Sequence, residues 1–284
     1  MAILLLIFVV GLAAGFVDAI AGGGGLVMLP ALIFSGLPVS SAIATNKLCG
    51  TFGALASSLK FAQSKQIDWW ACVAMGIPAV IGAYAGSRSI GLLPAAWAEP
   101  VVITLMVAIT LFVIVKPNFG MASATAAQAL PDQPLSNQSS LNKSSLNKSS
   151  LGQSPPNQKQ LSPARLVSGV VAGGVIGFHD GFFGPGTGIF LVFALLSLWS
   201  LDFLRGTGST KVINLLTNLT ALITFAASGD IDYSKGIYGA FGVGLGSFLG
   251  ATFATKKGAK LIKPIFITVT VALVTKLLIN YAHR

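Results

Sequence analysis

Four ionisable side chains form two matching pairs inside strongly apolar stretches of the sequence. Asp18 and Asp180 each directly precede a glycine cluster, whereas Lys47 and Lys211 each follow a short polar stretch. A charge at the centre of a bilayer costs at least about 2.5 to 3.5 kcal/mol, so ionisable residues within membrane segments are functional candidates. An ammonium group with hydroxyl and amide neighbours can bind the oxygens of a small anion. These residue types therefore predict an anion site.

The glycine clusters indicate a second part of that site. A helix that begins just after a break presents unpaired N–H groups and the positive end of its dipole to an anion. Short, glycine-interrupted apolar segments at corresponding places in two halves of a chain indicate the binding site of a secondary transporter. The predicted substrate-binding residues are Gly22, Gly23, Gly24, Gly25, Thr45, Asn46, Lys47, Gly184, Gly186, Thr187, Gly188, Ser209, Thr210 and Lys211.

Several of these residues also have structural interpretations, which the sequence leaves open. The glycines could serve only close helix packing. Asp18 could pair with Lys47, and Asp180 with Lys211, as structural ion pairs that orient broken helices. His179 is either a packing residue or, beside Asp180, a group that titrates near neutrality.

Composition makes lipid the main solvent of this chain. Of its 284 residues 54% are hydrophobic and 9% are charged, with a mean hydropathy of +0.80, whereas soluble domains carry about 25% charged residues. The net charge of +10 comes from Lys and Arg in short loops beside apolar segments, without the basic stripe that nucleic-acid binding needs. Cys49 and Cys72 lack CxxC spacing and a His partner, and no nucleotide, metal or hydrolase motif occurs. We expect no metal, no cofactor and no nucleic-acid partner.

The chain is duplicated. The stretch that ends at Asp18 matches the stretch that ends at Asp180, and at a later constant offset Lys47 matches Lys211 and Asp68 matches Asp232. Repeats at a constant offset predict two structurally equivalent halves. We assign residues 1–117 to the first membrane repeat, 165–284 to the second, and the Ser-, Asn- and Gln-rich residues 118–164 to a disordered linker.

Each half is predicted to contain five helical segments, in the first half at residues 2–21, 25–36, 40–63, 69–88 and 95–116. An odd number of membrane segments in each half would give the two halves opposite orientations in the membrane. The distribution of Lys and Arg then places the linker in the cytoplasm and both termini outside. The second segment spans only about 18 Å at 1.5 Å per residue, which predicts a broken or re-entrant helix pair around the glycines. The fold class is therefore all-α, a polytopic transmembrane bundle of two inverted repeats.

The motifs Gly15-Phe16-Val17-Asp18 followed by Gly22 to Gly25, Ala44-Thr45-Asn46-Lys47 and Gly184-Pro185-Gly186-Thr187-Gly188 resemble the TauE/SafE family of sulfite and organosulfonate exporters. The likeness covers both membrane halves and leaves out the linker. It implies transport of sulfite, taurine-related sulfonates, sulfoacetate, thiosulfate or a similar anion, with export and uptake both found in the family.

The residues thus predict an alternating-access carrier of a small anion in the inner membrane of a cell, and the resemblance implies that this anion contains sulfur. Export is favoured because an inside-negative potential drives each negative charge outward by about 2.3 kcal/mol per 100 mV. The alternatives are an anion channel of the same architecture and a proton-coupled uptake carrier that uses Asp18, Asp180 or His179. An enzyme is not expected, since the ionisable membrane residues are duplicated. Homo-oligomers stay possible, because Gly82-x-x-x-Gly86 and Gly246-x-x-x-Gly250 could pack within a protomer or between protomers.

Overall fold

A computed structural model describes residues 1–92 and 163–257, together with isolated residues between 94 and 108. All elements in these ranges are helices, so the predicted all-α class is confirmed. The predicted segment 95–116, the linker up to residue 162 and the chain beyond residue 257 lie largely or entirely outside the described residues. In order the helices are α1 (Ala2–Ala21), α2 (Gly25–Phe34), α3 (Val39–Gln63), α4 (Trp69–Ile90), α7 (Pro163–Phe182), α8 (Thr187–Trp199), α9 (Phe203–Ser228) and α10 (Tyr233–Lys257).

The helix boundaries follow local sequence signals. The α1 and α2 helices end and begin at the first glycine cluster, and α3 starts directly after Pro38. Asp68 caps the start of α4, because its carboxylate accepts the Ala71 N–H at 2.9 Å. The α7 helix begins at Pro163, slightly before the predicted start of the second repeat at residue 165. The first four predicted segments therefore match the observed helices to within two residues at each end.

The outer surface of the bundle suits lipid. The α1, α4, α9 and α10 helices are each long and apolar enough to cross a bilayer. Large apolar side chains on these helices point outward, and Ile81, Ile223 and Phe241 each remain more than 60% exposed. A surface of this kind is unfavourable in water, so the described part of the chain is that of a multi-pass membrane protein.

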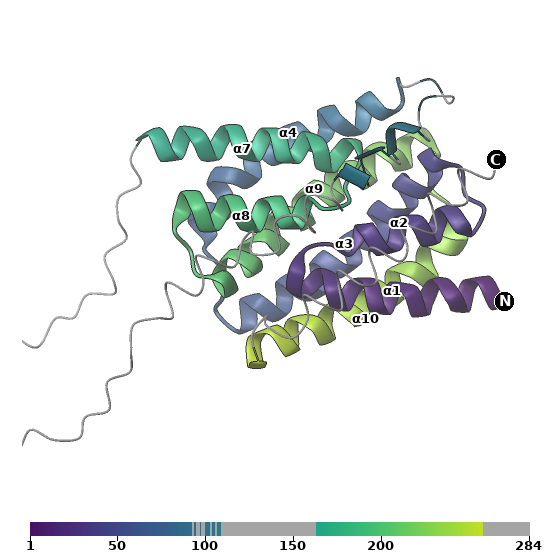
Figure 1. The fold of residues 1–284 in the computed structure, drawn as a ribbon, viewed down its shortest axis with the longest axis horizontal. Coiled ribbons are helices and arrows are strands. Elements are labelled where there is room, and N and C mark those ends of the chain that lie inside the picture. The colour runs from purple at the N-terminus through teal and green to yellow at the C-terminus, as the bar shows by residue number, and fades with distance from the viewer. Residues whose placement is uncertain are drawn as a thin grey trace, which may run out of the picture.

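The first two helices of each half form a hairpin. The α2 helix turns back beside α1, and α8 turns back beside α7, so that both hairpin tips lie near the middle of the bundle (Figure 1). In the same view α1 runs inward from the end where the N-terminus lies, whereas α7 runs inward from the opposite end. The two hairpins therefore approach each other tip to tip.

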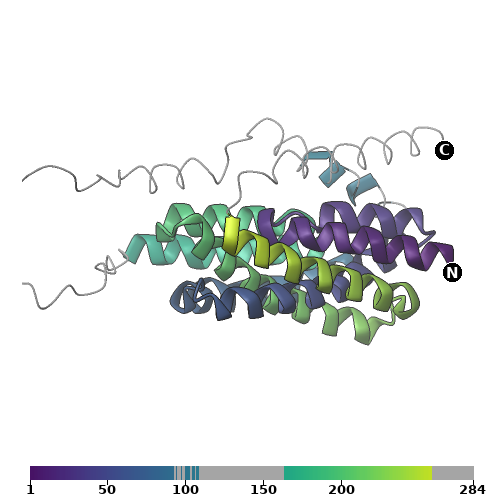
Figure 2. The ribbon, with the colours of Figure 1, turned by 90° about the horizontal axis from the view of Figure 1, so that it is seen from below.

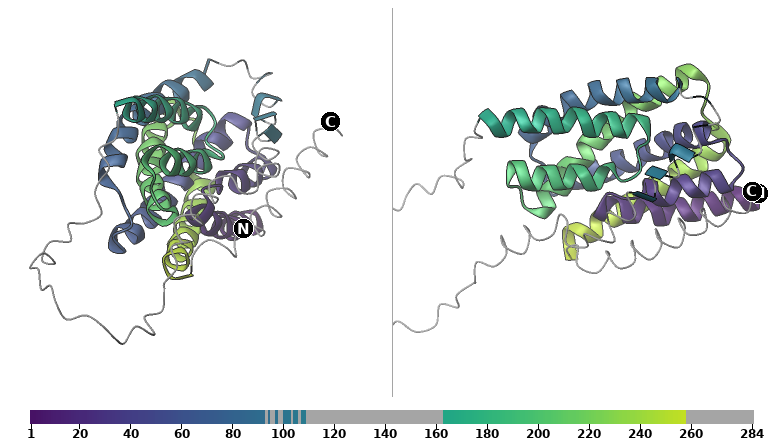
Figure 3. Two further views of the ribbon diagram at one scale, coloured as in Figure 1. Left: turned by 60° about the vertical axis from the view of Figure 1, so that its left-hand side comes forward. Right: turned by 45° about the horizontal axis from the view of Figure 1, so that its top comes forward.

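The last described helix of each half packs against the opposite half. The α10 helix lies along α1 and α3, and α4 lies along α7 and α9, as the views in Figures 2 and 3 show. A Cβ atom at Gly82 would lie 2.1 Å from the Gly174 carbonyl oxygen, and one at Gly246 would lie 2.0 Å from the Leu12 carbonyl oxygen. Both glycine motifs thus pack within the protomer, where they let backbones of different halves touch.

Candidate functional site

The two glycine clusters meet at the hairpin tips. Gly22 and Gly186 have left-handed φ angles of 77° and 85°, which favour glycine because other residues are strained there. A Cβ atom at Gly188 would lie only 2.5 Å from the Gly22 carbonyl oxygen. The close approach of the two tips therefore depends on glycine at both clusters.

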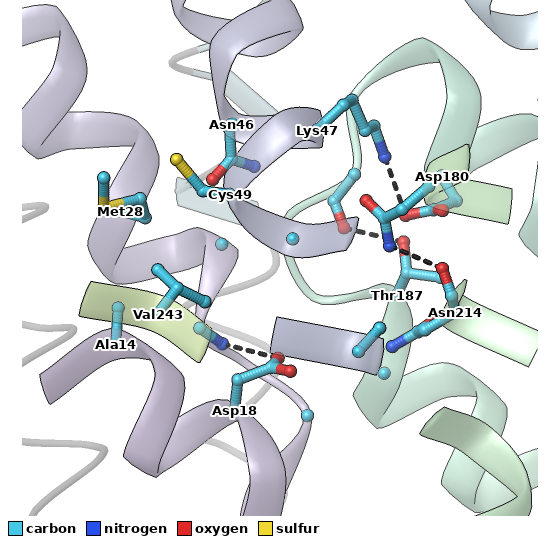
Figure 4. Close-up of a pocket in the computed structure, with 18 of the residues that line it drawn as sticks. Ala14, Asp18, Met28, Asn46, Lys47, Cys49, Asp180, Thr187, Asn214 and Val243 are labelled. Atoms are coloured by element: carbon cyan, nitrogen blue, oxygen red, sulfur yellow. Dashed lines mark hydrogen bonds and ion pairs between the residues drawn. The ribbon is translucent and has the colours of Figure 1, made fainter. Parts of the chain in front are cut away.

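A cavity of about 50 Å³ lies beside the touching tips. One water needs roughly 10 to 15 Å³ of such space, so the cavity has the size for a small ligand. Figure 4 shows Lys47 pointing to Asp180 on one side of the cavity, while Asp18, on α1, points to the first glycine cluster. The predicted residues that line the cavity are Asp18, Gly22, Gly24, Gly25, Asn46, Lys47, Asp180, Gly184, Gly186, Thr187 and Gly188.

The other predicted residues lie outside this lining: Gly23, Thr45, His179, Ser209, Thr210 and Lys211. Two of them form equivalent contacts between the halves. The Thr45 hydroxyl accepts the Asp232 N–H at 3.0 Å, and the Ser209 hydroxyl accepts the Asp68 N–H at 2.9 Å. The Thr45 contact fixes the start of α10 against the first half, and the Ser209 contact fixes the start of α4 against the second half. Both hydroxyls therefore help to hold the two halves together.

The predicted ion pairs are present with exchanged partners. Lys47 Nζ lies 3.0 Å from Asp180 Oδ1, and Lys211 Nζ lies 2.8 Å from Asp18 Oδ2. The alternative of structural ion pairs within each half, Asp18 with Lys47 and Asp180 with Lys211, is therefore wrong in its partners. The reason is the tip-to-tip arrangement, which brings each lysine to the opposite hairpin: a Cβ atom at Gly184 would lie 2.6 Å from Lys47 Nζ.

The two ion pairs have different surroundings. Asp18 uses both carboxylate oxygens, since Oδ1 accepts the Gly24 N–H at 3.0 Å while Oδ2 contacts Lys211. Lys211 also donates to the backbone oxygen of Asp18. Asp180 has only the contact with Lys47, and its buried Oδ2 has no hydrogen-bond partner among the described residues. The side chain of Asp18 is 21% exposed, whereas that of Asp180 is 3% exposed.

Two asparagines in the lining were missed by the sequence predictions. Asn214 and Asn218 line the cavity from α9, and the Asn218 amide nitrogen donates to the Asn214 backbone oxygen at 2.7 Å. At the offset that relates Lys47 to Lys211, their counterparts in α3 are Gly50 and Ala54. A usable signal exists, because Lys211, Asn214 and Asn218 follow the i, i+3, i+7 spacing of one helix face. The duplication does not mark them, because the equivalent residues of α3 differ.

His179 lies against aromatic rings near the second hairpin tip. Its ring makes edge-on contacts with Phe183 and Phe190 at centroid distances of 5.7 and 5.6 Å. Nδ1 lies 3.2 Å from the Thr187 hydroxyl, whereas Nε2 is buried without a partner in the described ranges. These contacts fit a packing role. Among the described residues, no group of three or more His, Cys, Asp or Glu side chains is placed to hold a metal ion.

Comparisons with known proteins agree on one family. The model of the family described as "Sulfite exporter TauE/SafE" matches residues 7–277. The "Probable membrane transporter protein ORF9" of Sinorhizobium sp is 30% identical over 99% of this chain and 94% of its own length. YfcA of Escherichia coli K12, described as a probable membrane transporter protein, is 28% identical over 96% of this chain and 88% of its own.

A further relative, the "Probable membrane transporter protein" of Haemophilus influenzae, is 30% identical over 97% of this chain and 94% of its own length. No solved structure matches the chain significantly. The family match covers nearly the whole sequence and includes both hairpins and the cavity between them. The chain therefore belongs to the TauE/SafE sulfite exporter family, as a multi-pass membrane transporter and not an enzyme.

Proposed function

We propose that this protein exports a small sulfur-containing oxyanion by alternating access and binds it in the cavity between the hairpin tips. The observation that carries the proposal is the convergence of two helix starts on one small cavity. Gly25 opens α2, Thr187 opens α8, and both line the cavity. The N–H groups of Leu26, Val27, Thr187 and Ile189 already donate to carbonyl oxygens of the preceding turns. The helix starts therefore support anion binding chiefly through the positive ends of two helix dipoles that point at the same cavity.

Side chains supply further donors at the same place. The Asn46 amide nitrogen lies next to the start of α2, because a Cβ atom at Gly25 would come within 3.5 Å of it. Lys47 is 1% exposed and brings the positive charge that lines the cavity. A sulfite or sulfonate group has three oxygens around one sulfur, so ammonium, amide and backbone donors can each contact a different oxygen. This donor set supports a compact oxyanion as substrate.

The family supports sulfur chemistry, and membrane energetics support export. The matching family model describes sulfite exporters. An inside-negative potential drives each net negative charge outward by about 2.3 kcal/mol per 100 mV. A cavity of about 50 Å³ between two interlocked halves also favours a carrier that encloses one ion at a time.

We also propose that the halves, residues 1–117 and 165–284, are inverted in the inner membrane, with residues 118–164 in the cytoplasm and both termini outside. The opposite courses of α1 and α7 in Figure 1 support this arrangement. Alkaline phosphatase fused at the C-terminus should be active, and the same enzyme inserted in the linker should be inactive. Activity at both places would contradict the topology.

The transport experiment uses purified protein in liposomes. Wild-type protein should take up sulfite with saturable kinetics, and internal unlabelled sulfite should accelerate uptake, because a carrier exchanges its substrate whereas a channel does not. Lys47→Met should abolish this flux. The control is Lys60→Met, which changes a lysine of the same helix outside the cavity lining and should keep the flux. Unchanged flux in Lys47→Met would contradict the proposed site.

A further inference from the structure

We propose that Asp180 binds a proton whenever the anion binds, so that each transported anion carries one proton with it. This inference rests on the proposed function, because it concerns the same cavity. It assigns different roles to two aspartates that are equivalent in sequence: Asp180 exchanges the proton, and Asp18 holds the first hairpin in place.

The geometry around Asp180 leaves one carboxylate oxygen available for a proton. Asp180 lines the cavity and is 2% exposed. Its Oδ1 is bound to Lys47 at 3.0 Å, and its Oδ2 is buried without a hydrogen-bond partner in the part of the chain that the structure describes. Buried carboxylate oxygens are normally paired. This oxygen belongs to a residue that lines the cavity, and it is the place where a proton would bind.

The charge count explains why a proton should enter. The empty site is neutral, because the Lys47 ammonium balances the Asp180 carboxylate and Lys211, just outside the lining, balances Asp18. A monoanion that contacts Lys47 would leave one uncompensated negative charge in a nearly fully buried place, which is strongly unfavourable. Protonation of Asp180 restores neutrality. In this step a proton from water adds to the Asp180 carboxylate. Lys47 then exchanges its contact with Asp180 for one with the anion. When the anion is released, the proton returns to water and the ion pair forms again.

The other titratable groups near the cavity are less suited to this role. Both oxygens of Asp18 are already engaged, by the Gly24 N–H and by Lys211. Lys211 does not line the cavity, His179 is packed against aromatic rings, and Cys49 carries no charge as a thiol. Among the described residues, those that α8, α9 and α10 contribute to the lining carry no charged side chain. Within the described ranges, the titratable groups that line the cavity with Asp180 are Asp18, Lys47 and Cys49, and His179 precedes it on α7.

Coupling to one proton sets the net charge that crosses the membrane with each anion. A monoanion that carries one proton crosses the membrane without net charge, and a dianion crosses as one net negative charge. Export of a dianion is then still driven by the inside-negative potential. The number of charges per anion can be measured from the equilibrium distribution across a liposome membrane at a set potential.

The test uses wild-type protein in liposomes at equal pH on both sides, with methanesulfonate as a probe that stays a monoanion. At an inside-positive potential of 100 mV, a monoanion that moves alone accumulates about 50-fold, whereas one that moves with a proton does not accumulate. An internal pH indicator should report one proton entering per methanesulfonate. Accumulation near 50-fold without proton entry would overturn the inference and leave the proposed function standing.

Two matched variants assign the proton to one aspartate. Asp180→Asn keeps the side chain neutral, so anions should move without a proton, and accumulation at 100 mV should rise about 50-fold over wild type. Asp18→Asn should keep the wild-type accumulation ratio even if its flux falls. If the protein carries sulfite but not methanesulfonate, sulfite serves as the probe. Its accumulation in Asp180→Asn should then again be about 50-fold higher than in wild type.

The contrary outcomes are distinct. A change of ratio in Asp18→Asn but not in Asp180→Asn would overturn the assignment. If Asp180→Asn does not fold, the proton count of the wild-type protein tests the coupling, and the accumulation ratio of Asp18→Asn tests whether Asp18 binds the proton instead. Absence of saturable uptake of both sulfite and methanesulfonate would contradict the proposed function, and the inference with it.

Discussion

The two ion pairs at the centre of this transporter are equivalent in sequence and different in structure. Lys211 and Asp18 form a pair that is reinforced by the Gly24 N–H and by the Asp18 backbone oxygen. Lys47 and Asp180 form a pair that lines the cavity and leaves one carboxylate oxygen without a partner in the described ranges. Duplication thus supplies a symmetric frame, within which the two pairs differ in their contacts and in their place relative to the cavity.

The frame itself is closely symmetric. Thr45 and Ser209 make the same contact with the start of the last described helix of the opposite half. A further departure from symmetry lies on α9, where Asn214 and Asn218 stand in place of Gly50 and Ala54. This contrast suggests that the frame and the site can be altered separately.

The largest effect is expected when one lysine of a pair is removed. Lys47→Met leaves Asp180 buried without its partner, which should lower the free energy of unfolding by about 3 to 5 kcal/mol. Lys211→Met should cost less, because Asp18 keeps the Gly24 N–H and is 21% exposed. Thermal unfolding of the purified variants in detergent measures the difference. Equal losses would contradict the distinction between the two pairs.

The exchanged partners can be tested by removing both charges of a pair. A double variant with Lys47→Met and Asp180→Leu should regain most of the stability lost in Lys47→Met, because a buried pair replaced by apolar residues is often neutral. The matched control combines Lys47→Met with Asp18→Leu and should be less stable than Lys47→Met alone. Recovery in the control instead would mean that the pairs form within each half.

The helix crossings should respond symmetrically in the two halves. Gly82→Ala and Gly246→Ala each place a Cβ atom about 2 Å from a backbone oxygen of the opposite half, so each should destabilise the protein by about 1 to 3 kcal/mol. Gly91→Ala is the control, because its Cβ atom would meet nothing closer than 3.6 Å. A large loss in only one of the two crossings would show that the halves are not equivalent frames.

The asparagines should affect binding more than stability. Asn214→Gly gives α9 the residue that α3 carries at the equivalent position, and it removes an amide from the cavity lining. Loss of one hydrogen bond, at about 0.5 to 1.5 kcal/mol, should raise the apparent KM for sulfite by up to about tenfold. Uptake rates over a range of sulfite concentrations measure this. An unchanged KM would place the anion away from α9.

The smallest effect is expected at the paired hydroxyls. Thr45→Val and Ser209→Ala each remove one hydrogen bond to the start of a helix, so each should cost about 0.5 to 1.5 kcal/mol of stability. Because the two contacts are equivalent, the two losses should be alike, and thermal unfolding in detergent again measures them. A much larger loss of sulfite affinity than of stability would instead favour direct contact with the substrate.

Much of the fold could be predicted, because apolar stretches and breaks are local signals. Residues 2–21 and 69–88 correspond closely to α1 and α4, and the glycine clusters lie at the hairpin tips as expected. The sequence does not show which half a helix packs against, because periodicity shows only which face of the helix is apolar. The exchange of α4 and α10 between the halves was therefore not predicted, and the wrong partners for Lys47 and Lys211 follow from the same gap.

The candidate site was predicted only where the duplication marked it. The glycines and Lys47 were found because each has a counterpart in the other half. Asn214 and Asn218 were missed because they have none, although helical spacing places them on the face of Lys211. Residues that break the symmetry of a duplicated transporter are therefore candidates for substrate contacts in their own right.

The most direct test is to locate the anion in an experimental structure. Selenite, the selenium analogue of sulfite, can be placed by anomalous scattering in crystals of the protein. We expect its selenium between the start of α2 and the start of α8, with an oxygen in contact with Lys47 Nζ. Selenite bound elsewhere, or a cavity that stays unoccupied at concentrations that saturate sulfite flux, would contradict the account.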